Sequence, residues 1–380
     1  MSFAIEGGIN TKILLCMYDV YAGGAETQFR YLAEFLSNNP DVELTCLFEK
    51  LDLKKESRSI NFLEQHKIKY FNLNIEPLSS KQGELFLKLH MGKFRRYLIG
   101  KKVDMFLKAQ PHFDWVITYN YTFLPYTEKF HRRGTKILFS ERNDASVIKN
   151  SQDYQGYVKL CDVVTCNSKY SQKQINKYCG INPIYIHNGI HIRPECFRIN
   201  DCRRQKNIEV IVSARISPEK NLDILLNALI LDRNLPIKIH VCGKVASENY
   251  YNKLLTRINE EKLEENIIFE GFQSNMLDWY HKSAFVILPS FQEGTPNAIL
   301  EAYAYGIPAI ASKIEPNSVL FNDEKLLFDP NKAEELVEAI YYICNLSDEA
   351  FVDLIQKNYE LVCREYGIQK MCFSYLNLLN

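Results

Sequence analysis

The chain lacks the features that would assign it to a membrane, secreted or redox class. No apolar run approaches the length of a membrane span. The first residues, MSFAIEGGIN, show no basic stretch followed by an apolar core, which a secretory signal peptide requires. The eleven cysteines include no C-x-x-C pair and no Cys/His cluster. We therefore expect reduced, structural thiols and a cytoplasmic location.

The chain also lacks net charge and the common cofactor motifs. Lys and Arg number 46 and balance 46 Asp and Glu, so no field of one sign favours nucleic acid. The fingerprint G-x-G-x-x-G is absent, which argues against a nicotinamide or flavin site in the N-terminal half. No D-x-D pair follows a strand, and no spaced His/Asp/Glu cluster suggests a divalent metal. We expect no metal and no other cofactor.

Strand-like runs alternate with helical periodicity along the chain, a pattern typical of parallel sheets covered on both faces. The expected strands are residues 12–18, 42–48, 68–73, 114–119, 136–140, 162–167 and 183–187, then 208–214, 237–242, 266–270, 284–289 and 307–311. A charged stretch of weak pattern separates the two sets, and 380 residues is long for one core. We predict an α/β protein with domains 1–193 and 194–360, and a C-terminal helix, 361–380, that packs back on the N-terminal domain.

The most informative segment is SFQEGTPNAILEAYAYGIPAIAS, residues 290–312. It joins a strand, a glycine turn and an apolar helix. We expect Thr295 to cap this helix and Pro296 to take its first position, so that the amides of Asn297 and Ala298 lack intrahelical partners. Such amides and the helix dipole attract an anion. The turn therefore predicts a phosphate site.

Two carboxylates flank this turn. Glu301 lies on an apolar helix, where a carboxylate needs a partner, and the vicinal diol of a ribose would supply two donors. Glu293 precedes the turn and can reach whatever the phosphate carries. Each has a structural alternative: Glu293 can complement the helix N-terminus, and Glu301 can meet a core arginine or tyrosine.

Two further loops carry candidate phosphate contacts. Gly23 and Gly24 follow the first strand and let the backbone approach a ligand, although simple turn geometry is the alternative. Arg215 and Lys220 follow the strand 208–214. If Ser217 caps the next helix, Lys220 lies in its first turn, where a cation is disfavoured unless an anion binds. The alternative is a lysine that extends into water.

The pair Glu293 and Glu301, spaced around this turn, resembles the E-x7-E signature of glycosyltransferase family 4. The resemblance covers nearly the whole chain. It implies the GT-B fold, in which two Rossmann-like parallel-sheet domains face a cleft, and metal-independent transfer with retention of anomeric configuration.

The resemblance also implies roles for individual residues. Glu301 would bind the ribose, Glu293 the transferred sugar, and Arg215 with Lys220 the diphosphate and the charge on the leaving group. The implied catalytic residues are Glu293, Arg215 and Lys220. The implied nucleotide-sugar site comprises Gly23, Gly24, Arg215, Lys220, Gly271, Phe272, Gly294, Thr295, Pro296, Asn297, Ala298 and Glu301.

Acceptor or sugar contacts are expected from Glu26, Glu141, Arg142 and Asn143. The last three end a strand, where ligand sites of parallel sheets lie. Many family members carry a histidine near this place and this chain does not, but a branch that acts on lipid-linked oligosaccharides has a similar Ser-Glu-Arg/His-Asn run. The alternative is an ion pair that holds a loop.

Residues 81–110 form a basic, amphipathic helical pattern, and the stretch around Lys88 to Lys108 has two interpretations. One face can pack on the core while the lysines are solvated. Alternatively, the helix docks on anionic lipid at the inner face of the cell membrane.

These observations favour an enzyme that moves a hexose or N-acetylhexosamine from a nucleotide diphosphate sugar, UDP-linked, to a saccharide or polyprenyl-linked acceptor in polysaccharide assembly. The alternative is a catalytically silent GT-B partner subunit that binds saccharide or stabilises an active transferase. Such subunits commonly lose the cationic residues that bind the diphosphate, or the paired glutamates. Arg215, Lys220, Glu293 and Glu301 are all present.

Overall fold

The structure, a computed structural model, describes residues 10–18, 24–51, 57–75, 92–119, 121–199, 201–205 and 207–379. The chain forms two compact units, Met1–His187 with Met371–Asn380, and Asn188–Lys370. The division after His187 precedes the boundary expected from the sequence, because Ile190 pairs with Gly367 and ties the connecting segment to the second unit.

The first unit contains a seven-stranded parallel sheet in the order β3-β2-β1-β4-β5-β6-β7. Its strands are β1 (Thr11–Met17), β2 (Val42–Phe48), β3 (Lys69–Asn72), β4 (Trp115–Tyr119), β5 (Lys136–Glu141), β6 (Val163–Cys166) and β7 (Ile184–Tyr185). Each overlaps a predicted strand. The strand order reverses between β1 and β4, which places a topological switch point at their carboxyl ends.

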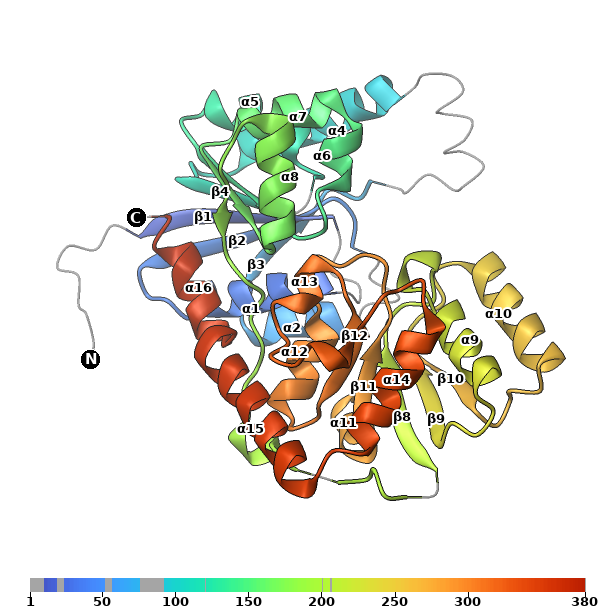
Figure 1. Ribbon diagram of the computed structural model, residues 1–380. Helices are drawn as coiled ribbons and strands as arrows, with labels where there is room; N and C mark the ends of the chain where they lie inside the picture. Colours follow the sequence, from blue (N-terminus) through green and yellow to red (C-terminus); the bar gives the residue numbers. More distant parts are fainter. Residues whose placement is uncertain are drawn as a thin grey trace. The chain divides into compact units, whose positions relative to one another are not determined.

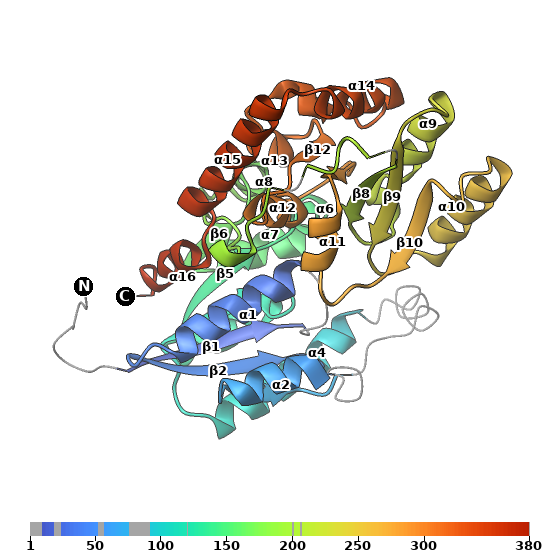
Figure 2. The ribbon, with the colours of Figure 1, turned by 90° about the horizontal axis from the view of Figure 1, so that it is seen from below.

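Helices cover both faces of this first sheet. They are α1 (Gly24–Ser37), α2 (Ser57–Gln65), α4 (Gly92–Ala109), α5 (Thr127–His131), α6 (Ser146–Asn150), α7 (Gln152–Lys159) and α8 (Lys169–Cys179). Helix α1 runs along β1 and β2 (Figure 2), and it buries an apolar stripe that includes Phe29 and Leu32. The Phe29 ring lies 5.6 Å from the ring of Phe48 and 5.8 Å from that of Tyr119. Helix α4 contributes Val103 to a separate core cluster with Leu14.

The C-terminal residues from Met371 onward belong to the first unit. They include the end of helix α16 (Ile368–Leu376). The Trp115 indole donates a hydrogen bond of 2.9 Å to the carbonyl of Leu379, and the hydroxyls of Ser140 and Tyr375 lie 2.6 Å apart. Buried hydrogen bonds therefore fix the chain end to strands β4 and β5.

The second unit contains a six-stranded parallel sheet in the order β10-β9-β8-β11-β12-β13. Its strands are β8 (Ile208–Ser213), β9 (Ile237–Cys242), β10 (Ile267–Gly271), β11 (Phe285–Leu288), β12 (Ala309–Ser312) and β13 (Leu327–Phe328). The first five match predicted strands. The last has only two residues and shows no periodicity in the sequence. The prediction of two parallel-sheet domains is confirmed.

Helices also cover both faces of the second sheet. They are α9 (Asp223–Leu231), α10 (Glu248–Glu260), α11 (Leu277–Lys282), α12 (Asn297–Ala304), α13 (Glu315–Ser318), α14 (Ala333–Cys344) and α15 (Asp348–Glu365). Helices α9 and α10 lie beside β8, β9 and β10 (Figure 1). Apolar residues of α9, α10, α14 and the start of α15 form one core cluster with this sheet, and those of α11, α12 and the end of α15 form another.

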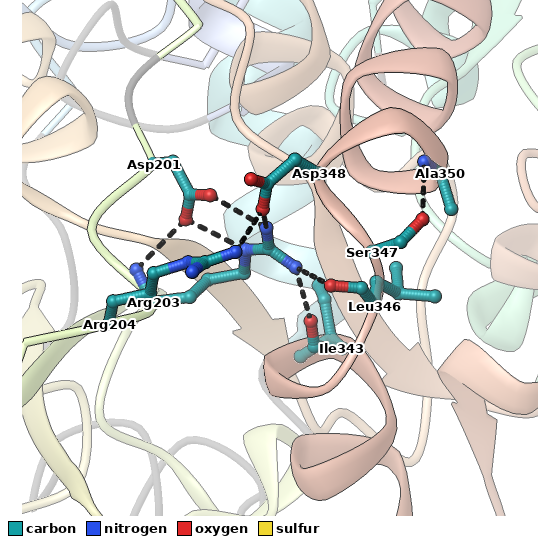
Figure 3. Close-up of polar contacts among 8 residues, drawn as sticks. All are labelled: Asp201, Arg203, Arg204, Ile343, Leu346, Ser347, Asp348 and Ala350. Atoms are coloured by element: carbon teal, nitrogen blue, oxygen red, sulfur yellow. Dashed lines mark hydrogen bonds and ion pairs between the residues drawn. The ribbon is translucent and has the colours of Figure 1, made fainter.

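A buried arginine fastens the start of this unit to its last helices (Figure 3). Arg203 donates to Asp201, at 2.7 Å, and to the carbonyls of Ile343, at 3.2 Å, and Leu346, at 2.9 Å. Its guanidinium also lies 3.6 Å from the centre of the Phe351 ring. This group satisfies carbonyls at the end of α14 that the helix itself leaves unpaired.

Candidate functional site

Two charged side chains from separate loops meet at the switch point of the second sheet. Strands β8 and β11 are neighbours there. Lys220 follows β8, Glu293 follows β11, and their Nζ and Oε1 atoms lie 2.7 Å apart. Only 14% of the Lys220 side chain and 11% of the Glu293 side chain are exposed. Ligands bind at such points in open α/β sheets, so this ion pair marks the candidate site.

Glu293 is held by a second donor. The Ser290 hydroxyl, at the end of the β11 segment, donates to the same oxygen, Oε1, at 2.7 Å. The Phe291 amide donates to the Glu219 carbonyl at 2.9 Å and ties this loop to the one that carries Lys220. Glu293 is thus held by its own loop, and a backbone bond joins this loop to the one that carries Lys220.

The local structure around Lys220 corrects the sequence interpretation. Lys220 does not lie in the first turn of the following helix. It ends a short 3-10 turn, Pro218–Lys220, and α9 begins only at Asp223. Asn221 separates them with a left-handed backbone, φ 52°, and its side chain donates to the carbonyls of Pro289 and Pro330. The partner of the Lys220 charge is therefore Glu293, and not the dipole of α9.

Arg215, the other predicted phosphate cation, lies at the end of β8 with 63% of its side chain exposed. Its guanidinium is 3.7 Å from Glu219. An exposed pair of this kind contributes little to stability. Arg215 can therefore reorient toward a ligand at small cost.

The turn before α12 also differs in part from the prediction. Pro296 is the N-cap and Asn297 the first helical residue, one position later than expected. The Asn297 amide donates to the Thr295 carbonyl at 2.9 Å, so it is not an unpartnered donor. In the described ranges, the Ala298 amide donates to no backbone carbonyl outside α12, and no N-cap side chain accepts a bond at the start of this helix. The anion site predicted here thus has one available amide of the two, because the backbone folds into a tight turn at Thr295.

Glu301 lies on α12, one turn after Asn297. The Tyr280 hydroxyl donates to Oε2 of Glu301 at 3.0 Å. Burial raises the pKa of the Glu301 carboxyl to about 7, and the bond from Tyr280 opposes this rise. The tyrosine partner that we considered as a structural alternative is therefore present. A ribose contact through the other oxygen stays a prediction.

The loop after β10 presents an aromatic face. Gly271 has a left-handed backbone, φ 68°, and the Phe272 side chain that follows is 51% exposed. The Lys244 Nζ lies 4.6 Å from the centre of the Phe272 ring. The Gly243 amide donates to the Gly271 carbonyl at 2.8 Å. The loops after β9 and β10 are thus joined at Gly271 and Phe272, which belong to the predicted nucleotide-sugar site.

Lys244, Ser290 and Tyr280 were not predicted from the sequence. Lys244 and Ser290 lie just after β9 and β11, and this placement is a usable signal because ligand sites gather at carboxyl ends of parallel strands. Tyr280 lies on α11 and had no such signal.

The candidate residues of the first unit are only partly described. Gly23 lies outside the described residues. Gly24 begins α1, and Glu26 lies in the first turn of this helix. Asn143 follows β5, and its amide donates to Oε1 of Glu141 at 2.6 Å.

Arg142 and Glu141 lie inside the first unit. Arg142 donates to the Tyr375 hydroxyl at 3.1 Å and to the Ile186 carbonyl at 3.4 Å. Glu141 is fully buried and accepts from the Tyr121 hydroxyl. Arg142 thus connects β5 to the C-terminal helix, and this arrangement favours the loop-holding alternative. The predicted sugar contacts of Glu141, Arg142 and Asn143 stay predictions.

The buried Glu141 gives a testable pH dependence. Burial raises the pKa of Glu141 from its usual value to about 7. Because the folded protein holds this proton more tightly than the unfolded chain, the stabilisation is complete below the unfolded pKa and is lost as pH rises through about 7. We expect the unfolding free energy of the wild type to fall by on the order of 2–3 kcal/mol between pH 4.5 and 7.5, relative to Glu141→Gln. Urea denaturation at each pH measures this difference. If the unfolding free energies of the wild type and Glu141→Gln changed equally with pH, this prediction would be wrong.

In the described ranges, no three His, Cys, Asp or Glu side chains form a group that could hold a metal ion. No described helix is long and apolar enough to cross a membrane.

Comparison with known proteins shows that the chain is similar to glycosyltransferases. Residues 198–361 match the sequence model of the family Glycosyl transferases group 1. An uncharacterized glycosyltransferase of Haemophilus influenzae is 24% identical over 58% of this chain and 62% of its own length. A Campylobacter jejuni enzyme named as an N-acetylgalactosaminyltransferase acting on a diphospho-undecaprenol-linked saccharide is 22% identical over 83% of this chain and 84% of its own. The first three curated relatives are matched over only 62%, 37% and 58% of their lengths.

The fold as a whole is similar to solved glycosyltransferase structures. Anabaena HepE, solved with UDP and glucose, superposes with a TM-score of 0.77 at 19% identity, over 97% of this chain and 99% of that one. This likeness shows the fold, and the predicted GT-B class is confirmed. The matched family residues include the candidate site of the second unit, from Arg215 to Glu301. The second unit is thus similar in sequence to the group 1 glycosyl transferases, and the chain has the GT-B fold.

Proposed function

We propose that the protein is a glycosyltransferase that moves a hexose or N-acetylhexosamine from a UDP-linked sugar to a saccharide or lipid-linked saccharide acceptor, in polysaccharide assembly. The observation that carries this proposal is the Lys220–Glu293 pair. Its charges come from two loops of a matched glycosyltransferase domain and meet at the switch point of the sheet, at 2.7 Å. The names of the relatives support UDP as the nucleotide and a polyprenyl-linked saccharide as the acceptor class.

The donor would bind at the carboxyl ends of β8, β10 and β11. The diphosphate would meet the Lys220 ammonium, the Arg215 guanidinium and the Ala298 amide. Lys220 offers a compact charge and Arg215 a planar fork that can engage two phosphate oxygens. The ribose would meet Glu301, and the base the exposed ring of Phe272. When the diphosphate arrives, Lys220 exchanges part of its contact with Glu293 for phosphate, and the Glu293 carboxylate turns toward the sugar.

The reaction would proceed with retention of configuration. The bond from the anomeric carbon to the leaving phosphate breaks while the acceptor hydroxyl bonds to the same face of that carbon. The departing phosphate oxygen takes the hydroxyl proton, so no side chain serves as a dedicated base. Lys220 and Arg215 stabilise the charge that develops on the phosphate. These two cations supply the role that a divalent metal has in other transferases, and we propose a metal-independent enzyme.

A donor-binding measurement tests this function. UDP binding only to the folded protein raises the unfolding temperature as the UDP concentration exceeds Kd. We expect UDP and UDP-sugars to stabilise the wild type and Glu301→Ala to lose most of this response, since the ribose contact is removed. The control is Glu338→Ala, which removes an exposed glutamate of α14 in the same unit. Stabilisation by NAD and not by UDP, or an unchanged response in Glu301→Ala, would contradict the proposal.

We also propose that helix α4 docks on anionic lipid, which would keep the enzyme near a membrane-anchored acceptor at the cytoplasmic face. The exposed surface of this helix carries Tyr97, Leu98 and Met105 together with Lys101 and Lys108. The Lys101 Nζ lies 4.8 Å from the centre of the Tyr97 ring. Large apolar groups beside lysines suit the boundary between headgroups and acyl chains.

Vesicle binding tests this surface. We expect the wild type to cosediment with vesicles rich in phosphatidylglycerol and not with pure phosphatidylcholine, since each basic residue near the surface contributes about 1 kcal/mol. The double variant Tyr97→Ser, Met105→Ser should lose most of this binding. Leu255→Ser is the control, because it removes an exposed leucine from α10 of the other unit. Equal binding to both vesicle types, or none to either, would exclude the docking.

A further inference from the structure

A histidine lies between two glutamates on three neighbouring strands of the second sheet. His240 on β9 contacts Glu270 on β10 through Nδ1, at 2.7 Å from Oε1, and it contacts Glu209 on β8 through Nε2. The strands are adjacent, and alternate residues share a face, which brings the three side chains together. The His240 ring also packs against Trp279 of α11, with 5.3 Å between ring centres. None of these residues belongs to the site described above.

The contacts of His240 with Glu209 and Glu270 connect β8, β9 and β10, and we call this arrangement the His240 bridge. A neutral imidazole can donate a hydrogen bond from only one nitrogen, whereas the doubly protonated ring donates from both. Both carboxylates are therefore satisfied when His240 carries a proton on each nitrogen. The His240 side chain is mostly buried, and a hydrogen bond to a carboxylate is stronger there than at an exposed site.

The two glutamates differ in their distance from the candidate site. Glu209 is the second residue of β8, near the amino end of the sheet. Glu270 is the next-to-last residue of β10, two residues before Phe272. The Gln273 side chain donates to the Glu270 carbonyl at 2.6 Å. His240 therefore reaches the base of the loop that presents the Phe272 ring.

The end of β10 needs such support. Among the described strands, β10 is at the edge of its sheet and has β9 as its one neighbour. Its pairing with β9 shifts register between Phe269 and Gly271, on either side of Glu270. A register shift interrupts the regular backbone hydrogen bonds between two strands. Side-chain contacts therefore contribute more to the position of β10 at this point. The contact between His240 and Glu270 lies at this interruption.

We propose that His240 is a positioning residue for nucleobase recognition: through Glu270 it sets the end of β10 and hence the orientation of the Gly271–Phe272 turn. This inference rests on the proposed function, since the turn is the element expected to meet the base of UDP. His240 itself does not touch the nucleotide. The bond from His240 to Glu209 anchors the other side of the ring.

Three single substitutions test the inference. Glu270→Gln and His240→Gln weaken the bridge on the side of the loop, whereas Glu209→Gln weakens it on the far side and is the matched control. The binding of UDP, ADP and GDP is measured by titration calorimetry, together with the unfolding temperature of each variant. We expect Glu270→Gln and His240→Gln to bind UDP about three- to thirtyfold more weakly and to discriminate less against ADP. Glu209→Gln should keep UDP affinity within about twofold while losing as much thermal stability as Glu270→Gln.

Two results would overturn the inference by itself. One is a wild type that binds UDP while Glu270→Gln binds it equally well with unchanged base preference. The other is a loss of UDP affinity that follows the unfolding temperature across all three variants, as a purely structural role requires. A wild type that binds none of the three nucleotides overturns the proposed function, and the inference with it.

Discussion

Replacement of Lys220 by alanine is expected to lower kcat/KM for sugar transfer by about a thousandfold, the effect of removing one preorganised group that stabilises charge in a transition state. The substitution also leaves the Glu293 carboxylate, which is 11% exposed, without its cation. An uncompensated negative charge beside a diphosphate opposes donor binding as well. Transfer of a radiolabelled sugar from a UDP-sugar, at saturating and limiting donor, measures kcat and KM separately.

Two variants separate this effect from a general loss of an ion pair. The Lys332–Glu335 pair has the same separation, 2.7 Å, but the Lys332 side chain is 58% exposed. Lys332→Ala should keep nearly full activity. Lys220→Arg keeps the charge with another shape and should recover part of the activity. A Lys220→Ala enzyme as active as Lys332→Ala would rule out a catalytic role for this lysine.

Replacement of Arg203 by alanine is expected to destabilise the second unit by about 3–5 kcal/mol, because removing one partner of a buried ion pair leaves the others uncompensated. The Arg203 side chain is 1% exposed and binds Asp201 and two carbonyls at the end of α14. Chemical denaturation followed by circular dichroism measures the change. Below the unfolding transition, UDP affinity should stay at the wild-type level, since Arg203 lies outside the candidate site.

The neighbouring Arg204 provides a control for Arg203. Arg204 shares the partner Asp348, yet its side chain is 74% exposed. Arg204→Ala should change the unfolding free energy by less than about 0.5 kcal/mol. Equal destabilisation by the two substitutions would contradict the role assigned to burial.

The sequence predicted the fold well because each strand of the two sheets is a short buried run between turn signals. Strands β2 and β9 have the predicted bounds. Strand β13 was missed because two residues carry no period. Apolar runs of six or seven residues suffice for such predictions, since a strand buried on both faces has few other interpretations.

The sequence pointed to Lys220 and Glu293, which the structure pairs, but it did not predict their local geometry. The pairing of Lys220 with Glu293 depends on the left-handed Asn221 and on its bonds to Pro289 and Pro330, which are distant in sequence. The Asn297 amide was expected to be available, yet a turn at Thr295 uses it. Tertiary contacts determine both the Lys220–Glu293 pairing and the turn at Thr295. Neither feature produces a periodic pattern in the sequence.

The His240 bridge shows the same limit more clearly. Glu209, His240 and Glu270 are about thirty residues apart from one to the next, and nothing near each of them in the chain sets them apart. Only the register of β8, β9 and β10 brings them together. Spacing along one chain predicts local motifs such as the pair Glu293 and Glu301, and it cannot predict neighbours across a sheet.

A crystal structure of the protein with bound UDP tests the central claim most directly. We predict density for the diphosphate within hydrogen-bonding distance of the Lys220 ammonium and the Ala298 amide, with the uracil at the Phe272 ring. Ordered UDP bound elsewhere on the molecule, with the Lys220–Glu293 pair unchanged, would contradict the assignment of this site.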